Sequence, residues 1–254
     1  MQRTKIPWAD YVWNPISGCS PASEGCEHRY AEGIAKRFHL PWGKPVLHYD
    51  KLREPLKSPR VKPRRVFVCS MADIFHPDVP IGFLDKIFET IHCCNPNTKF
   101  IILTKRAERM KEFFSNRVSE LIKEKVWLGV TVENQTRADE RIPLLLQTPA
   151  VVRFVSVEPQ LEGIKLPMEL CTRVACHDWS PGPCDHPDCE CRAIHWVICG
   201  PETGPKARPF NLDWARSLRD QCKAADVPFF YKGNPKGGYL LDGVKHFNWP
   251  EVTR

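Results

Sequence analysis

Residues 126–158 read VWLGVTVENQTRADERIPLLLQTPAVVRFVSVE and contain a complete strand–helix–strand pattern. Two almost continuously apolar runs, Val126–Val130 and Val152–Val157, are typical of strands that are buried on both faces of a parallel sheet. The segment between them, Thr136–Leu146, has a helical pattern. These features predict a βαβ unit, in which a crossover helix joins two parallel strands.

The same alternation continues on both sides of this unit. Further candidate strands are Val66–Cys69, Phe100–Leu103, His195–Cys199 and Pro228–Tyr231, and an earlier one ends near Trp13. Helical patterns fall at Gly82–Cys93, Arg106–Phe114 and Leu212–Ala225. Six or seven such units predict an α/β fold, a partial (β/α) barrel rather than an open sheet. We expect residues 1–254 to form a single domain, with an insertion at 165–193 and a tail after Gly233 that closes over the last unit.

Length and composition limit the class of protein. The chain has 254 residues, of which 42% are hydrophobic, which is enough for a packed core. No apolar run approaches the ~18 residues that span a bilayer, and the N-terminal MQRTKIPWAD lacks the apolar region of a secretory signal. We therefore expect a cytoplasmic protein without a membrane partner. The net charge is +7, and the basic stretch KSPRVKPRR at 57–65 is either a solvated loop or a patch that contacts phosphate groups.

Polar residues follow nearly every candidate strand. They are Ser70, Asp73, Lys105, Glu133, Asn134, Glu158 and Glu202. In a parallel barrel such positions meet at one rim, where ligands bind. Side chains such as Asn134 and Ser70 could instead only cap the helices that follow them. The mixture of acids, hydroxyls and lysine suits a ligand that carries an amino group, a carboxylate and a ribose.

Residues 13–32 read WNPISGCSPASEGCEHRYAE, in which two cysteines each follow a glycine. Together with later blocks, among them VFVCSMADIFHPDVP, WLGVTVENQ, RFVSVEPQLEGI and HWVICGPETGP, this string resembles a phage-associated, radical-SAM-like "three-Cys-motif" family over about residues 8–232. The resemblance implies a partial barrel of radical-SAM type. It also implies an N-terminal loop that carries a [4Fe–4S] cluster, with S-adenosylmethionine bound at the unique iron and cleaved to a 5′-deoxyadenosyl radical.

On this resemblance, Cys19 and Cys26 match the first two cluster cysteines, and Tyr30 matches the aromatic residue beside the last one. The third cysteine is replaced by Arg29, whose guanidinium cannot ligate iron. Three interpretations are open: the cluster is absent and the barrel only binds ligands, another residue ligates the iron, or the substitution inactivates the protein. A replacement ligand would come from His28, Cys69 or Cys199.

A second group of cysteines and histidines falls within residues 171–191. The segment has little apolar content, so a bound metal would supply stability that it otherwise lacks. The sequence predicts a structural Zn²⁺ site formed by Cys176, Cys184, Cys189 and Cys191, with His177 and His186 as alternates. The alternative interpretations are a flexible cysteine-rich loop and a second iron–sulfur cluster.

These features give two hypotheses for the function. The first is a radical SAM enzyme of unspecified substrate, impaired by the loss of the third cluster cysteine. The second is a non-catalytic, zinc-containing protein that binds a nucleotide or nucleic acid. Both are compatible with a small-molecule or nucleic-acid substrate and with a protein partner, and neither specifies the oligomeric state.

Overall fold

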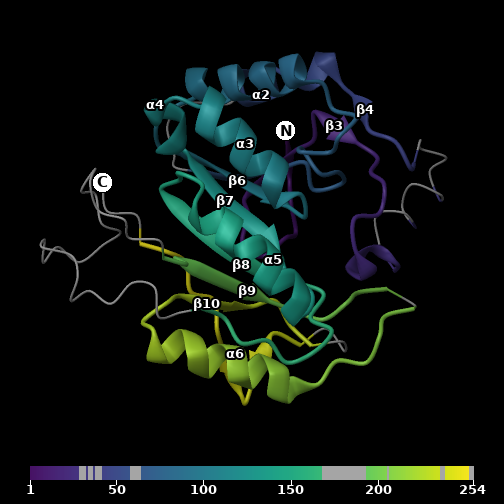
Figure 1. Cartoon of the computed structure of the whole chain (residues 1–254), viewed down its shortest axis with the longest axis vertical. Coiled ribbons are helices and arrows are strands. Elements are labelled where there is room, and N and C mark those ends of the chain that lie inside the picture. The colour runs from purple at the N-terminus through teal and green to yellow at the C-terminus, as the bar shows by residue number, and fades with distance from the viewer. Residues whose placement is uncertain are drawn as a thin grey trace, which may run out of the picture.

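The described part of the chain is built around one mostly parallel sheet. The structure is a computed structural model that describes residues 1–28, 33, 37, 42–57, 64–167, 193–204, 206–234 and 238–251. Within these ranges the sheet has eight strands in the order β1–β2–β5–β6–β7–β8–β9–β10 (Figure 1). Strand β1 is antiparallel to β2, and the other seven strands run parallel. This topology confirms the predicted α/β fold.

The elements have the following bounds. The sheet strands are β1 (Gln2–Arg3), β2 (Tyr11–Trp13), β5 (Arg64–Val68), β6 (Thr98–Thr104), β7 (Val126–Thr131), β8 (Val152–Val157), β9 (Trp196–Cys199) and β10 (Phe229–Tyr231). The α-helices are α2 (Ile81–Cys93), α3 (Ala107–Arg117), α4 (Glu120–Lys123), α5 (Gln135–Leu146) and α6 (Leu212–Ala224). Two small antiparallel sheets pair β3 (Ile16–Ser17) with β4 (Val46–Leu47) and β11 (Leu240–Leu241) with β12 (Val244–Lys245). Every predicted strand and helix is present, with small shifts at its ends.

The two faces of the sheet bury different kinds of side chain. Helices α2 and α3 lie toward one end of the sheet, α5 over its middle and α6 at the other end, and the core beneath them is largely aliphatic (Figure 1). The opposite face is mainly aromatic, with Phe67, Trp127, Phe154, Trp196 and Phe230. Glycine is required at position 129 on β7, because a Cβ there would lie 2.4 Å from the ring of Phe154. The aromatic layer fills the bottom of the barrel, and polar residues farther along the same strands form its open end.

The C-terminal tail covers the sheet edge at β10, as the sequence predicts. Phe247 pairs with Phe230 in an antiparallel bridge, and the two rings stack with their centroids 4.4 Å apart. The backbone N–H of Tyr231 donates to the carbonyl of His246 at 2.8 Å. The tail therefore satisfies backbone groups that an open edge strand would expose.

Two sequence predictions fall wholly or largely outside the described residues. Residues 168–192 of the insertion at 165–193 and residues 58–63 of the basic stretch are not among those that the structure describes. The boundaries of the insertion and the role of the stretch therefore stay predictions. Among the helices that the structure describes, none combines the length and apolar character needed to cross a bilayer.

Candidate functional site

A cavity of about 560 Å³ lies at the carboxyl ends of the parallel strands. Its wall takes polar residues from successive strand ends, namely Ser70, Asp73, Lys105, Thr131, Ser156, Glu158, Glu202 and Lys232. The segment after β3 closes one side with Gly25, Cys26 and His28. A cavity of this size and position is typical of a site for a small ligand.

The strand register explains why these side chains meet. Inward-facing Thr131 on β7 is paired with Ser156 on β8. Side chains two residues apart on a strand point to the same face, so the next layer contains the residues two positions farther along. The register of β8 with β9 and of β9 with β10 extends this layer to the last two strands of the sheet. We call it the mouth layer, and it consists of Glu133, Glu158, Gly200 and Lys232.

Cys19 and Cys26 lie in a loop over the mouth layer, residues 18–28, which we call the cysteine loop. Both residues are buried, with exposed fractions of 1% and 2%. Cys26 lines the cavity, and the Sγ of Cys19 lies 3.9 Å from Nη1 of Arg106 at the end of β6. The structure thus brings both thiols to the strand ends that carry the predicted binding residues.

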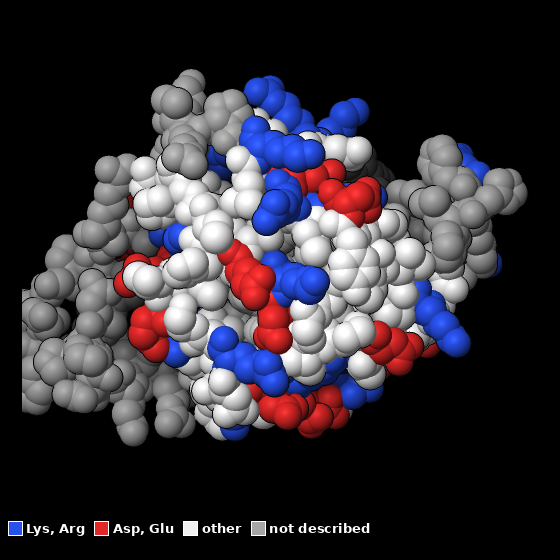
Figure 2. Space-filling view, turned by 90° about the horizontal axis from the view of Figure 1, so that it is seen from above, with Lys and Arg blue, Asp and Glu red and all other residues white. Residues whose placement is uncertain are grey.

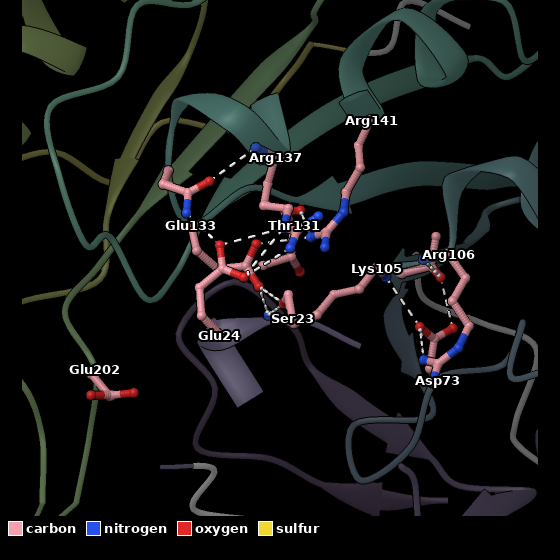
Figure 3. A network of polar contacts seen from close by, with 12 residues as sticks. Ser23, Glu24, Asp73, Lys105, Arg106, Thr131, Glu133, Arg137, Arg141 and Glu202 are labelled. Carbon is pink, nitrogen blue, oxygen red and sulfur yellow. Dashed lines mark hydrogen bonds and ion pairs between the residues drawn. The ribbon is translucent and has the colours of Figure 1, made fainter. Parts of the chain in front are cut away.

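Glu133 is the buried centre of the contacts between the cysteine loop and the barrel (Figure 3). Its carboxylate accepts hydrogen bonds from the Ser23 hydroxyl, from the Lys105 ammonium and from Nη1 of Arg141, the last at 2.8 Å. Burial raises the pKa of Glu133, but the positive charges of Lys105 and Arg141 outweigh burial and hold the pKa below its ordinary value. Glu133 is therefore an ionised anchor for the loop.

A second contact fixes the middle of the cysteine loop. The Glu24 carboxylate accepts hydrogen bonds from the Asn134 amide and from Nη2 of Arg137, the latter at 3.0 Å. Asn134 also caps α5, because its side-chain oxygen accepts the backbone N–H of Arg137 at 2.9 Å. The interpretation of Asn134 as a helix cap is therefore correct, and this residue also joins the helix start to the loop.

The Glu24 contact predicts an acid-sensitive step in stability. The hydrogen bonds from Arg137 lower the pKa of Glu24 from 4.5 to about 2. Because the folded-state pKa is depressed, this stabilisation is complete above about pH 4.5 and is lost as the pH falls toward about 2. Both side chains are partly exposed, so we expect Glu24→Gln to cost about 1 kcal/mol near neutral pH and almost nothing at the acid limit.

Urea unfolding of wild type and Glu24→Gln across this pH range measures the difference. Glu120→Gln is the control, because Glu120 is 81% exposed and, among the residues that the structure describes, its ion pair is with Lys123 on its own helix. A Glu24→Gln difference that is independent of pH would contradict the assigned ion pair.

Asp73 positions Arg106 against the start of the cysteine loop. Its Oδ1 accepts the Thr104 hydroxyl at 2.7 Å, and its Oδ2 accepts Nη1 of Arg106 at 2.9 Å. Two backbone N–H groups within the described part of the chain also donate to this carboxylate. Arg106 then donates through Nη2 to the carbonyl of Ser20 at 3.2 Å. With four donors, Asp73 organises the wall of the cavity.

Glu202 and Arg208 tie the cysteine loop to the segment after β9. Arg208 donates from Nη2 to Oε1 of Glu202 at 2.7 Å and from its backbone N–H to Oε2 at 2.9 Å. The same guanidinium donates to the carbonyl of Glu24 at 3.0 Å and to the carboxylate of Glu27 at 3.3 Å. Burial raises the pKa of Glu202, but the hydrogen bonds from Arg208 outweigh burial and lower it. The loop is thus held from three sides by Arg106, Arg137 and Arg208.

Sequence comparison identifies the family of this chain. The profile of DUF5131, a family of proteins of unknown function, matches residues 3–248. The chain belongs to this family. No curated protein matches the sequence.

Two solved structures of spore photoproduct lyase resemble this DUF5131 chain. One, complexed with dinucleoside spore photoproduct, has a TM-score of 0.55 at 11% identity, and the match covers 92% of this chain and 78% of the lyase. The other, a double mutant with bound AdoMet and dinucleoside spore photoproduct, has a TM-score of 0.45 at 14% identity and covers 62% of this chain. That second match spans 48% of the lyase, about half its length. The likeness to the first of these structures is one of fold, a mostly parallel sheet covered by helices.

The structure separates the predicted binding residues of this DUF5131 chain into three groups. Ser70, Asp73, Lys105, Glu158 and Glu202 line the cavity. Glu133 and Asn134 contact the cysteine loop instead. Outside the described residues lie Arg29, Tyr30 and the predicted zinc ligands Cys176, His177, Cys184, His186, Cys189 and Cys191. Among the residues that are described, no group of three or more Cys, His, Asp or Glu side chains is arranged to hold a metal ion.

Three arginines of the site are not predicted from the sequence. Arg137 and Arg141 follow Glu133 at intervals of four residues, which places both on one face of α5, next to the end of β7. The four-residue spacing is a sequence pattern from which the contacts of Arg137 and Arg141 with the site could have been predicted. Arg208 lies in a loop without periodicity, and its role has no comparable signal.

The candidate replacement ligands for iron differ in position. Cys199 lies in the core beneath the helices, where its Sγ donates to the side-chain oxygen of Gln160 at 3.2 Å, so its assignment as a replacement ligand is wrong. Burial raises the pKa of Cys199 well above its usual value. Cys69 and His28 both line the cavity, and burial also raises the pKa of the Cys69 thiol.

Proposed function

We propose that this chain binds S-adenosylmethionine in the cavity at its strand ends, as a radical-SAM-like protein whose [4Fe–4S] site is impaired by Arg29. The observation that carries the proposal is the composition of one wall. Cys26 of the cysteine loop shares a cavity of about 560 Å³ with the strand-end residues Lys105, Glu158 and Lys232. The radical-SAM-like fold and the family resemblance of the N-terminal motif support the same ligand.

The cavity has the groups that S-adenosylmethionine requires. Thr131 and Ser156 offer hydroxyls, and Glu158 and Lys232 offer opposite charges for an amino-acid group. Trp8, Phe67 and Leu103 contribute apolar surface of the kind that packs against a purine. A small number of polar groups on an apolar wall is the usual composition of a cofactor site.

The residues do not fit a cluster that is held by three thiolates. Cys19 and Cys26 stand at the mouth of the barrel, but the residue at the third position is arginine, which has no lone pair for iron. The loop is instead held by charged side chains, with Arg106, Arg137 and Arg208 as donors. No radical step is therefore assigned to this chain.

Restoring the third cysteine is expected to restore iron binding. After anaerobic reconstitution, we expect Arg29→Cys to contain about four iron and four sulfide per chain and to turn brown, because three thiolates can then hold a cubane. Wild type is expected to contain far less iron. Iron, sulfide and zinc analysis together with the visible absorbance spectrum measure both.

Arg117→Cys is the matched control, since it adds a thiol at an exposed arginine on α3, away from the cavity. A colourless Arg29→Cys protein would show that the cluster site is misplaced. Isothermal titration with S-adenosylmethionine tests the ligand independently of iron, and the absence of binding to both wild type and Arg29→Cys would overturn the proposal.

The alternative function is binding of a nucleotide or nucleic acid without a cluster. It is favoured by the hydrogen bonds and ion pairs through which side chains hold the cysteine loop to the barrel, and one similar structure is complexed with dinucleoside spore photoproduct. On the face shown in Figure 2, however, Lys and Arg side chains alternate with Asp and Glu and form no broad basic surface. Anisotropy of a labelled single strand, with S-adenosylmethionine as competitor, distinguishes the two functions.

A further inference from the structure

We propose that Glu158 and Lys232 form an anchor for a zwitterionic head group, in which an ammonium and a carboxylate are attached to one carbon, as in an α-amino acid. This inference deepens the proposed function and rests on it for the remainder of the ligand. Glu158 follows β8 and Lys232 follows β10, and both side chains line the cavity. The Lys232 ammonium donates to Oε1 of Glu158.

Glu158 and Lys232 can form an ion pair because the residue between them in the mouth layer is a glycine. Glu158 and Lys232 lie on strands that flank β9, and Gly200 occupies the mouth layer between them. A Cβ at Gly200 would lie 3.2 Å from the Cβ of Lys232 and 3.6 Å from the Cδ of Glu158. The missing side chain lets the two charges meet above the backbone and face the cavity.

Glu158 differs from the other acids of the cavity wall. The carboxylate of Asp73 accepts four donors, and that of Glu202 is covered by Arg208. Among the described residues, Glu158 has Lys232 as its single hydrogen-bond partner, through one oxygen. The two side chains keep exposed fractions of 20% and 26%. A carboxylate oxygen and ammonium hydrogens are thus available to a ligand in the cavity.

The charge of the pair selects the class of head group. The ion pair is neutral as a whole, so a simple anion would face the repulsion of Glu158 and a simple cation that of Lys232. A zwitterion satisfies both members, since its ammonium donates to Glu158 and its carboxylate accepts from Lys232. Each of these contacts is charge-assisted and lies in a partly buried site, where such contacts are strong.

Three probes separate the head group from the rest of the ligand. S-adenosylhomocysteine has both the head group and adenosine, 5′-methylthioadenosine lacks the head group, and L-methionine lacks adenosine. For Glu158→Gln and Lys232→Met we expect the affinities of S-adenosylhomocysteine and L-methionine to fall by about 10- to 100-fold. The affinity of 5′-methylthioadenosine is expected to be unchanged. Isothermal titration measures all three, and thermal unfolding verifies the fold of each variant.

Gly200→Ala tests the geometry while both charges are kept. Its methyl group would push Lys232 away from Glu158, so we expect the same selective loss for ligands that carry the head group. The control is Asp85→Asn, which breaks a partly exposed ion pair with Arg117 between α2 and α3, remote from the cavity. This control is expected to leave all three affinities at their wild-type values.

The outcomes distinguish the anchor from the proposed function. If both adenosine ligands bind equally well and Glu158→Gln changes neither affinity, the anchor is wrong and the proposed function stands. If L-methionine binds in a Glu158-dependent way and neither adenosine ligand binds, the anchor stands and the proposed function is wrong. If no probe binds to wild type, both are overturned.

Discussion

Replacing Glu133 with glutamine is expected to lower the free energy of unfolding by about 3–5 kcal/mol. The substitution keeps the size of the side chain and removes its negative charge. The side chains of Lys105 and Arg141 are only 12% and 6% exposed, so both cations lose their shared counterion in a buried place. Breaking a buried ion pair from one side is costly because the desolvation of the remaining charges is no longer compensated.

Urea unfolding followed by the fluorescence of the eight tryptophans measures this change. The matched control is Glu140→Gln, because Glu140 is 51% exposed and pairs with Arg137 on the surface of α5 at 2.7 Å. It should cost about 0.5 kcal/mol or less. Adding Lys105→Met to Glu133→Gln should recover part of the loss, since one orphaned charge is removed. A loss below about 1 kcal/mol in Glu133→Gln would show that water replaces the carboxylate, contrary to the buried network.

The strands were predictable because the sheet is covered on both faces. All six residues of β7 are buried, so its sequence is apolar without alternation and is recognisable as a parallel strand. Strands β1, β3 and β4 have two residues each and include exposed or half-buried positions, which leaves no pattern to detect. The fold could therefore be predicted from the longer parallel strands, whereas these three short strands could not be predicted.

The position of the candidate site could be predicted from the sequence, but the hydrogen-bond partners of its carboxylates could not. Strand ends show where Asp73 and Glu202 lie, but not that other side chains already occupy their oxygens. The partners come from distant segments: Arg137 is 113 residues from Glu24, and Arg208 is 184 residues from the same residue. No periodic pattern connects such positions. The hydrogen-bond partners can be identified only in the three-dimensional structure. They are also what distinguishes Glu158 from the other acids of the cavity wall.

Gly25→Ala is expected to destabilise the protein by about 2–3 kcal/mol and to expose Cys26. A Cβ at position 25 would lie 2.3 Å from Cγ and 2.5 Å from Oε1 of Glu133. Glu133 cannot retreat, because Lys105 and Arg141 hold both oxygens of its carboxylate. The cysteine loop must therefore lift from the barrel, and the residue next to the substitution, which lines the cavity, moves with it.

Two measurements separate this effect from a general loss of packing. The first is urea unfolding, with Gly82→Ala as the control, because a Cβ at Gly82 in α2 meets nothing within 4 Å and is expected to be neutral or to stabilise the helix by up to about 1 kcal/mol. The second is the rate at which a thiol reagent labels Cys26, resolved by peptide mass spectrometry. Cys26 is 2% exposed in the seated loop, so lifting the loop should accelerate its labelling while Cys222 in the core of α6 stays protected. A Gly25→Ala protein with wild-type stability and wild-type labelling of Cys26 would mean that the loop does not rest on Glu133, and the assignment of the cysteine loop as one wall of the cavity would fail with it.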